Sequence, residues 1–331
     1  MKTGRAAMAS YGAVLALSLF CLDACKSQPT NPPPPEGPAS NQLSDSLPDQ
    51  PQPGVIRLAI GGDSRNDDSQ VLPWAFKEAK RRAAKAFFFL GDLEITSSLD
   101  MRIAPKLADL GGVPFYPLMG NHEVELLGIV PVLNRKRAVK KFQANFLKAS
   151  TVKLAPLADV VVYTVDLEGG IHFIALDNVS RKHEGFGPDQ LTWLKADLEA
   201  ASAANKVILV GMHKGLALNP ITKHAMDEDH ASAISDSDAA LALFKQYKVA
   251  DVFVSHSHRY SAYKQDGVDV RMTGGLGAPL VKGLAEADGG FHHFLLVDVP
   301  QAANKTPLQV EVVKFQGSPT KDTQDELLEI D

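Results

Sequence analysis

Cysteine is nearly absent from this chain of 331 residues, which contains only Cys21 and Cys25. Because both lie near the N-terminus, the rest of the chain can form no internal disulfide and must be stabilised by a hydrophobic core. An excess of basic residues is absent too. The net charge of −5 gives no basis for a nucleic-acid-binding surface.

The remaining composition is ordinary for a globular protein, at 45% hydrophobic and 22% charged residues. It suffices for one large domain or two modest ones. The densest basic run, Lys77–Lys85, alternates with alanines and is typical of the solvated face of a helix.

The N-terminal segment has the features of an export signal. Two basic residues precede the apolar stretch Tyr11–Leu22, whose length suits a signal-peptide core and is too short to span a bilayer comfortably. The sequence LDAC at 22–25 resembles a bacterial lipoprotein cleavage site. We therefore predict that 1–25 is a signal peptide, that Cys25 is lipidated, and that the protein is periplasmic or at the cell surface, anchored to a membrane. Plain secretion after cleavage nearby is the alternative.

Residues 26–54 are expected to form a linker. Nine prolines fall in this stretch, four of them consecutive at 32–35, and large apolar residues are few. Such a segment cannot bury enough surface to fold and stays extended. At about 3.1 Å per residue, it would hold a domain up to roughly 90 Å from its anchor.

From residue 55 onward, strand segments alternate with amphipathic helical segments. We expect strands at 55–62, 86–92, 113–121, 206–213 and 250–258, and helices at 71–85, 101–110, 136–148, 187–204 and 238–248. This order implies parallel strands with crossover helices. A hairpin is predicted over 159–177, and strands and turns from 260 on. No repeats occur, so 55–331 is expected to be one domain built on two sheets.

Polar side chains follow five of the apolar strands at the point where each strand ends. They are Asp63, Asp92, the group Asn121, His122 and Glu123, then His213, and the pair His256 and His258. Each alone has a structural explanation, such as a helix or turn cap. Ligands of open α/β sheets bind at the carboxyl ends of strands, so these groups are expected to converge on one site.

In their order, these motifs resemble those of the calcineurin-like metallophosphoesterases. The resemblance rests on GD at 91–92, GNHE at 120–123, the later His213 and SHSH at 255–258, and it extends from about Arg57 to Phe315. It implies an α/β fold, a four-layer αββα sandwich of two mixed β-sheets flanked by helices. The metal site would lie at the carboxyl ends of the strands.

The resemblance also implies a role for each motif residue. Asp92 would bridge two metal ions, with Asp63 and His258 holding the first. The second would be completed by Asn121, His213 and His256. His122 would lie beside the metals and protonate the leaving oxygen or orient the phosphate, and Glu123 would lie behind the ligands.

The residue types suit metal-dependent hydrolysis. Carboxylates and imidazoles together favour Mn, Fe or Zn over Mg or Ca. Two such ions about 3.5–4 Å apart stabilise the attacking and leaving oxygens of an in-line displacement. The predicted function is hydrolysis of a phosphoric ester, a mono- or diester, on a small-molecule or macromolecular substrate.

Arg65 departs from the family's first motif, Asp-x-His, because it stands where an imidazole is expected. Arginine has five donors and no acceptor, so it cannot hold a metal. Three interpretations are open. The remaining ligands suffice and Arg65 binds phosphate oxygens, or Asn66, Asp67 or Asp68 replaces the missing ligand. Alternatively, the site is degenerate, and the protein is a weakly active or non-catalytic surface lipoprotein that binds phosphorylated ligands. We predict the first, with Arg65 and His122 catalytic.

Other residues receive structural interpretations. Ser255 replaces a glycine of the last motif, a mild change in a turn. Residues 221–235 are expected to be a polar loop with His224 and His230 on the surface, and the remaining unmatched histidines are His172, His183, His292 and His293. GGLG at 274–277 is expected to be a tight turn, since no lysine and helix follow it. Substrate specificity is expected in loops such as 124–135 and 215–236.

Overall fold

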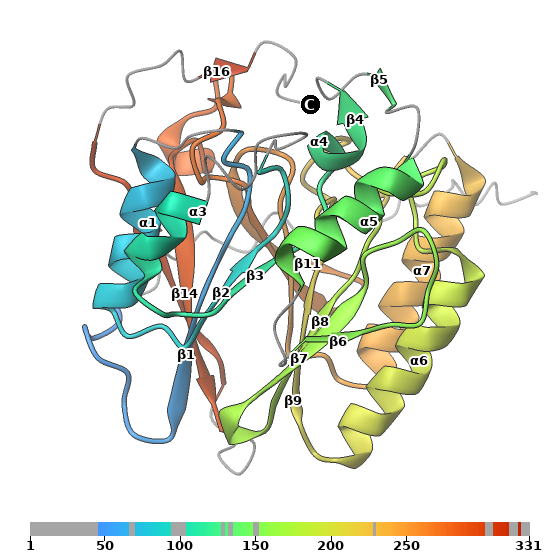
Figure 1. Ribbon diagram of the computed structural model, residues 1–331, viewed down its shortest axis with the longest axis horizontal. Helices are drawn as coiled ribbons and strands as arrows, with labels where there is room; N and C mark the ends of the chain where they lie inside the picture. The colour runs from blue at the N-terminus through green and yellow to red at the C-terminus, as the bar shows by residue number, and fades with distance from the viewer. Residues whose placement is uncertain are drawn as a thin grey trace, which may run out of the picture. The chain divides into compact units, whose positions relative to one another are not determined.

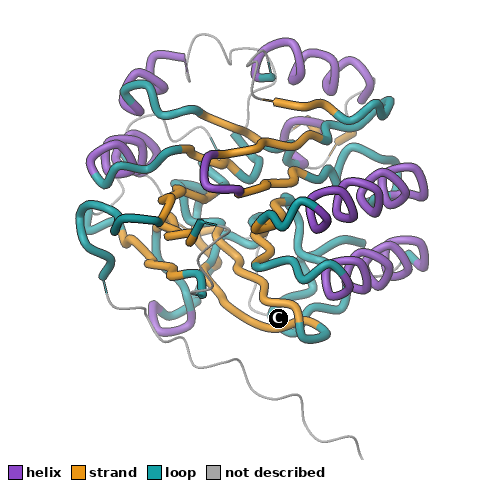
Figure 2. Tube along the Cα trace, turned by 90° about the horizontal axis from the view of Figure 1, so that it is seen from below, coloured by secondary structure: helices purple, strands orange, loops and turns teal. Residues whose placement is uncertain are grey.

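The apolar runs of the sequence form strands of two mixed β-sheets in the computed structural model, which places them in the middle with helices outside (Figure 2). The structure describes residues 46–65, 70–93, 104–126, 130–131, 135–147, 152–227, 230–301, 307–317 and 324–325. All belong to one unit, Gly37–Asp331. None of the helices in these ranges is both long enough and apolar enough to cross a bilayer.

The first sheet has five strands in the order β15-β14-β1-β2-β3. Strands β1, β2 and β3 are parallel neighbours, β14 pairs antiparallel with β1, and β15 pairs antiparallel with β14. Their bounds are β1 Val55–Gly61, β2 Ala86–Phe89, β3 Phe115–Pro117, β14 His293–Pro300 and β15 Gln309–Lys314.

The second sheet has seven strands in the order β11-β12-β10-β9-β8-β7-β6, with β12, β10, β9 and β8 parallel. Their bounds are β6 Val152–Leu154, β7 Tyr163–Leu167, β8 Ile171–Ala175, β9 Val207–Gly211, β10 Asp251–Val254, β11 Tyr260–Gln265 and β12 Val268–Thr273. Two short pairs accompany the sheets: β4 Glu125–Leu126 with β5 Val130–Pro131, and β13 Leu280–Val281 with β16 Gln324–Asp325.

Helices cover the outer faces of both sheets, and this confirms the predicted αββα arrangement (Figure 1). Helix α1 packs on the five-stranded sheet near α3, and α6 and α7 pack on the seven-stranded sheet. Helix α5 adds Val139 and Phe142 to the core between the sheets. The bounds are α1 Val71–Arg81, α3 Ala104–Leu107, α4 Asn121–Val124, α5 Arg135–Phe146, α6 Gly187–Ala203 and α7 Ala231–Gln246.

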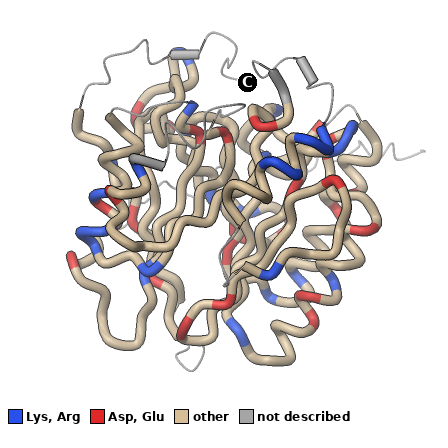
Figure 3. The backbone as a smooth tube through the Cα atoms, viewed as in Figure 1, with Lys and Arg blue, Asp and Glu red and all other residues tan. Residues whose placement is uncertain are grey.

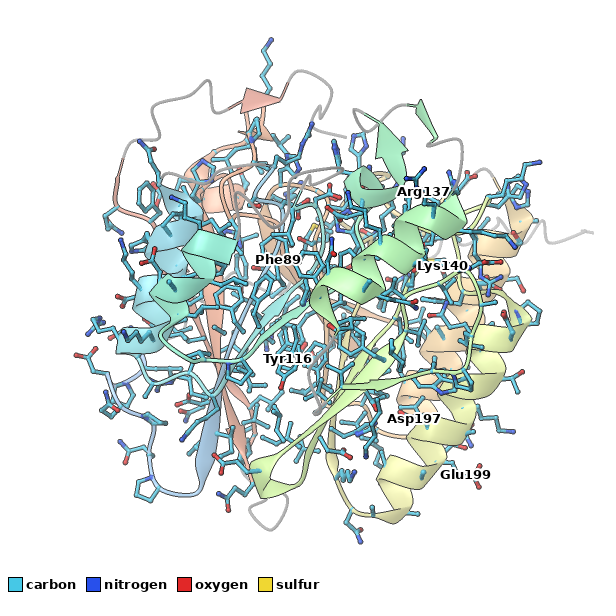
Figure 4. The ribbon with its side chains drawn as sticks, viewed as in Figure 1. Phe89, Tyr116, Arg137, Lys140, Asp197 and Glu199 are labelled. Atoms are coloured by element: carbon cyan, nitrogen blue, oxygen red, sulfur yellow. The ribbon has the colours of Figure 1, made fainter. Side chains whose placement is uncertain are left out.

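Strand β2 shows how the core is divided. Phe88 faces the other sheet, where its ring stacks on Phe173 at 3.6 Å between centroids. Phe87 faces the opposite way and meets Phe76 of α1 edge-on at 5.1 Å. Because side chains alternate along a strand, an unbroken apolar run is required where both faces are covered. Phe89 and Tyr116 are labelled in Figure 4. Phe89 packs on the α1 side of the sheet, and Tyr116 packs in the core between the two sheets.

Several element boundaries differ from the predictions. Helix α1 ends at Arg81, before the predicted Lys85, because Ala83 takes a positive φ of 58°. Helix α7 begins at Ala231, inside the stretch predicted as a polar loop, and the side chain of His230 accepts a hydrogen bond from the backbone of Ser232 at its start. His230 therefore caps this helix, and the prediction of a polar loop is wrong for residues 231–235. Part of the predicted helix 101–110, residues 101–103, lies outside the described residues.

Residues 46–54, the described part of the predicted linker, pack on the domain. Leu47 is 8% exposed, and its N–H donates to Glu311 at 2.8 Å. Arg82 donates to the carbonyl of Leu47 at 2.7 Å, and the buried Arg57 donates to the carbonyl of Pro48 at 2.8 Å. The prediction of an extended linker is wrong for these residues, because they find buried partners. The signal peptide, Cys25 and the rest of the linker lie outside the described residues.

Figure 3 marks the charged residues along the chain. Basic residues of the Lys77–Lys85 run pair with acids, as in Arg81 with Glu78 at 2.6 Å and Arg82 with Glu311 at 2.6 Å. The exposed Arg81 agrees with a solvated helix face, whereas Arg82 is buried and lies just beyond the end of the helix. Helix α5 carries basic residues at its exposed positions, among them Arg137 and Lys140, both labelled in Figure 4.

Candidate metal centre

The carboxyl ends of β1, β2, β3, β9 and β10 lie at one edge of the two sheets, on the side where α4 begins (Figure 1). The chain leaves each of these strands within a few residues of a predicted ligand. Asp63 and Asp92 follow β1 and β2, and Asn121 opens α4. The structure therefore brings together residues that are up to 195 positions apart in the sequence, from 63 to 258.

Asp92, His213 and His256 form the first group, with one ligand atom from each lying within 4.8 Å of the others. Nε2 of His213 lies 2.9 Å from Oδ1 of Asn121, 3.3 Å from Oδ1 of Asp92 and 3.2 Å from Nδ1 of His256. These neighbours are potential acceptors that converge on one nitrogen. A cation or a proton is required among them.

Asp63, Asp92 and His258 form the second group within the same limit. Nε2 of His258 lies 3.4 Å from Oδ1 of Asp63. Nδ1 of this ring lies 2.6 Å from the carbonyl of Pro279, to which it can donate only when it carries the proton. That tautomer leaves the Nε2 lone pair aimed at the carboxylate, as in a metal-ligating histidine. Asp92 belongs to both groups, so its carboxylate is shared.

The two aspartates of these groups are buried, and each has a carboxylate oxygen without a hydrogen bond, as expected of metal ligands. The side chains of Asp63 and Asp92 are 0% and 1% exposed. Oδ1 of Asp63 and Oδ2 of Asp92 accept no hydrogen bond, although a buried charge is costly unless it is paired or coordinated. Carboxylate, amide and imidazole donors together suit Mn, Fe or Zn.

Electrostatics in the site favour a carboxylate facing a cation. Burial raises the pKa of Asp92, but the adjacent His213 and His122 outweigh it and hold that pKa well below its usual range. Burial conversely lowers the pKa of His213, and Asp92 more than reverses the effect. Burial and the charge of Asp92 raise the pKa of Glu123 to about 7.

The backbone is constrained around the site. Asp63, Asp92, His256 and His258 all have positive φ angles, between 42° and 70°. Such conformations are unfavourable for residues other than glycine and persist only where the surroundings impose them. Gly91 allows the close approach of the strand ends, since a Cβ there would lie 2.7 Å from Nδ1 of His213.

Two residues that sequence reasoning placed at the margin hold the ligands in position. Ser255 donates its hydroxyl to Oδ2 of Asp63, an oxygen that also accepts the N–H of His256 at 2.8 Å. Glu123 accepts the N–H of Asp92 at 3.0 Å and the N–H of Gly120 at 2.8 Å. The sequence indicated these supporting roles only through position, because each of the two residues stands directly beside a motif residue.

Of the two predicted catalytic residues, His122 borders the shared carboxylate and Arg65 contacts the main chain of the same aspartate. His122 is buried, and its Nε2 lies 3.7 Å from Oδ2 of Asp92. Arg65 is half-buried, and its N–H donates to the carbonyl of Asp92 at 3.1 Å. Residues 66–68, the alternative ligands, lie outside the described residues.

The other histidines lie elsewhere in structural roles. Both ring nitrogens of His172 face carboxylates, and His292 and His293 are buried beside backbone carbonyls. His183 stacks on His230 at 4.0 Å between centroids. The GGLG segment runs along the end of β1: Leu276 donates to the carbonyl of Gly62 at 3.0 Å.

Solved structures with a similar fold include two phosphatases and PhoD. A dimetal phosphatase from Danio rerio matches with a TM-score of 0.55 and 13% identity, over 78% of this chain and 99% of that one. Purple acid phosphatase PPD1 from yellow lupin matches with a TM-score of 0.54 and 14% identity, over 81% of this chain and 55% of that one. PhoD matches with a TM-score of 0.54 and 13% identity, over 83% of this chain and 75% of that one. Among curated protein sequences, none matches this chain.

The family model for calcineurin-like phosphoesterases matches residues 56–260. This range contains every residue of the two converging groups, from Asp63 to His258. Members of this superfamily bind divalent metals at a dinuclear site. Together, the match over more than half of the sequence and the two-sheet fold establish that this chain belongs to the calcineurin-like phosphoesterases.

Proposed function

We propose that this protein hydrolyses a phosphoric ester, either a monoester or a diester, at a centre of two transition-metal ions. The observation that carries the proposal is the sharing of Asp92 by two groups of potential ligands. One carboxylate held between two converging sets of donors is the arrangement that a two-metal site requires.

The ligand sets follow from the contacts. Asp92, Asn121, His213 and His256 would hold one ion, and Asp63, Asp92 and His258 the other. Mn, Fe and Zn are the ions this donor set suits. When bound, two such ions act as Lewis acids that bring the pKa of water to about 7 and neutralise charge on the phosphoryl group.

His122 and Arg65 supply what the ligands cannot. The Nε2 of His122 lies 3.7 Å from Oδ2 of Asp92, so the imidazole stands beside the proposed metal site and can deliver a proton to the departing alkoxide oxygen. Arg65 follows Asp63 by two residues, and its planar fork suits two phosphoryl oxygens. With Arg65 binding substrate, the ion at Asp63, Asp92 and His258 would have three protein ligands, as many as catalytic metal sites commonly have.

The test is elemental analysis of the purified full chain combined with turnover of p-nitrophenyl phosphate. We expect bound Mn, Fe or Zn, and hydrolysis that depends on it. Asp269→Asn, at an exposed carboxylate paired with Lys264, serves as the control for substitution of an aspartate. Absence of metal and of turnover after all three metals have been supplied would reject the proposal. It would favour a non-catalytic protein that binds phosphorylated ligands.

Export and membrane anchoring through Cys25 are part of the same proposal. They are supported by the apolar segment 11–22, the LDAC sequence and the proline-rich stretch that follows. We expect the wild-type chain to fractionate with membranes and Cys25→Ser to be released. If both variants fractionate alike, lipidation at Cys25 is wrong.

A further inference from the structure

Ser255 brings to the candidate metal centre a side chain that the family's last motif lacks. That motif has glycine at this position, and the sequence alone indicated a mild change in a turn. Ser255 is not among the residues with a positive φ, so the backbone here does not require glycine. The residue is fully buried, and its N–H donates to the carbonyl of His213 at 2.8 Å. The serine is therefore part of the buried site.

The hydroxyl group of Ser255 is directed at Asp63. Oγ donates to Oδ2 of Asp63, and the same oxygen accepts the N–H of His256 at 2.8 Å. The carbonyl of Thr273 lies 3.3 Å from Oγ, but a hydroxyl has one proton, and a hydrogen bond to a charged acceptor is the stronger one. Gly62 leaves room for the contact, since a Cβ there would collide with Oγ of Ser255.

The two carboxylate oxygens of Asp63 consequently have different surroundings. Oδ2 is occupied by two donors of the protein. Oδ1 accepts no hydrogen bond from the part of the chain that the structure describes, and it lies 3.4 Å from Nε2 of His258, in the group that also includes Asp92. Only Oδ1 is left to face the cation that this group would hold. Ser255 thus fixes which oxygen of the carboxylate can be the ligand.

The ligand set of this ion is small, so the position of each ligand matters. Arg65 stands where the family's first motif has a histidine. The ligands that remain among the described residues are Asp63, Asp92 and His258. His258 is already oriented, because its Nδ1 lies 2.6 Å from the carbonyl of Pro279. Hydrogen bonds behind metal ligands commonly change metal affinity by about 10- to 100-fold, so the bond from Ser255 is of the kind that can offset a lost ligand.

We propose that Ser255 is a positioning residue that compensates for the imidazole missing at Arg65. By holding Oδ2 of Asp63, it presents Oδ1 to the cation in one fixed orientation, so that an ion with only three protein ligands is retained. A carboxylate that is already in position loses less conformational freedom on binding than one that can rotate. The inference rests on the proposed function, because it concerns one ion of the proposed two-metal centre.

The test compares Ser255→Ala with Ser257→Ala in the full chain. Ser257 is a matched control, because it is a buried serine of the same motif whose hydroxyl donates to the carbonyl of His224 at 3.0 Å and not to a ligand. The readout is binding of Zn²⁺ alone, titrated at neutral pH against a chelating indicator. For S255A we expect the more weakly bound of two Zn²⁺ ions to be held about 10- to 100-fold less tightly. S257A should bind both ions as the wild type does.

Arg65→His separates compensation from a general structural role. It supplies the usual imidazole, and histidine tolerates the positive φ of 44° at this position better than most residues do. The loss of Zn²⁺ affinity caused by S255A should therefore be at least about threefold smaller in the R65H background. An equal loss in both backgrounds would overturn the inference.

Ser255→Gly keeps the test independent of folding. It introduces the residue that the family's motif has, so the fold should tolerate it, and it should weaken Zn²⁺ binding as S255A does. Weaker binding in both variants without hydrolysis by the wild type would reject the proposed function and retain Ser255 as a positioning residue. Equal Zn²⁺ affinities of S255G, S255A and S257A would reject the inference even if the wild type is active.

Discussion

His122 contacts Asp92 through both its backbone and its ring: its N–H donates to Oδ1 at 3.0 Å, and its Nε2 lies 3.7 Å from Oδ2. Both residues are almost fully buried. The shared carboxylate therefore orients the imidazole. This relationship links the metal ligands to the residue proposed to donate the proton.

Replacing His122 by glutamine should lower kcat without loss of metal. General acid catalysis contributes about 10²- to 10⁴-fold, and the fall should be larger for phenyl phosphate than for p-nitrophenyl phosphate, whose leaving group needs less protonation. Steady-state kinetics with both esters and elemental analysis of the variant check this. Loss of metal in the same variant would instead point to a structural role.

Replacing Asp92 by asparagine should remove metal and the stability that metal binding adds. Binding to the folded state alone stabilises a protein, so chelation should lower the melting temperature of the wild type. Without chelator, Asp92→Asn should already have the lower melting temperature, and the chelator should not change it. Its turnover should fall at least about 10³-fold. Asp269→Asn should behave like the wild type. A chelator response retained in D92N would contradict the shared-ligand assignment.

His172 should make stability depend on pH away from the centre. Its two ring nitrogens lie 2.7 Å from Asp166 and 2.8 Å from Asp197, the latter labelled in Figure 4. Burial lowers the pKa of His172, but the two carboxylates outweigh it and raise the pKa above 6.5. The folded state thus holds the proton more tightly than the unfolded state. The stabilisation is complete below pH 6.5 and is lost as the pH rises through the raised pKa.

Urea unfolding of His172→Asn at several pH values checks this expectation. The variant should be less stable than the wild type at pH 6, and the difference should shrink in alkaline solution. His224→Asn, at a half-buried position, is the control for replacement of a histidine by asparagine. A difference that stays constant across the pH range would mean that His172 acts through packing alone.

Leu47→Ala should destabilise the domain by about 2 kcal/mol, at the low end for truncation of a buried leucine. Leu47 is 8% exposed and packs near Arg82 and Glu311, although its sequence context predicts an extended linker. Leu218→Ala, at a residue 61% exposed, should cost little. Denaturant unfolding of both variants measures the difference, and equal stabilities would show that residues 46–54 add nothing to the fold.

Local patterns predicted most of the scaffold. The unbroken apolar run at Ala86–Phe89 indicated a strand covered on both faces, and β2 is packed between α1 and the second sheet. The strand ends then indicated Asp63 and Asp92 as site residues, because parallel strands of a sheet end at the same edge. These inferences depend on periodicity and order, which the sequence displays directly.

Other features depend on partners that are distant in the chain. The start of α7 at Ala231 is set by the His230 cap in a segment whose polar composition resembles a loop. Ser255 supports Asp63 across 192 positions, and Glu311 accepts the N–H of Leu47 across 264. No local pattern encodes such contacts, since they arise only when the two sheets pack.

The sequence by itself determined the family, the order of strands and helices, and the types of residue that would meet at the strand ends. Only the tertiary structure decided that Asp92 is shared by two groups and that Ser255 and Glu123 hold the ligands. The physical reason is that hydrophobic periodicity specifies which face of an element is buried. The position of a polar group in the site depends on hydrogen bonds to chain segments that come together only in the folded protein.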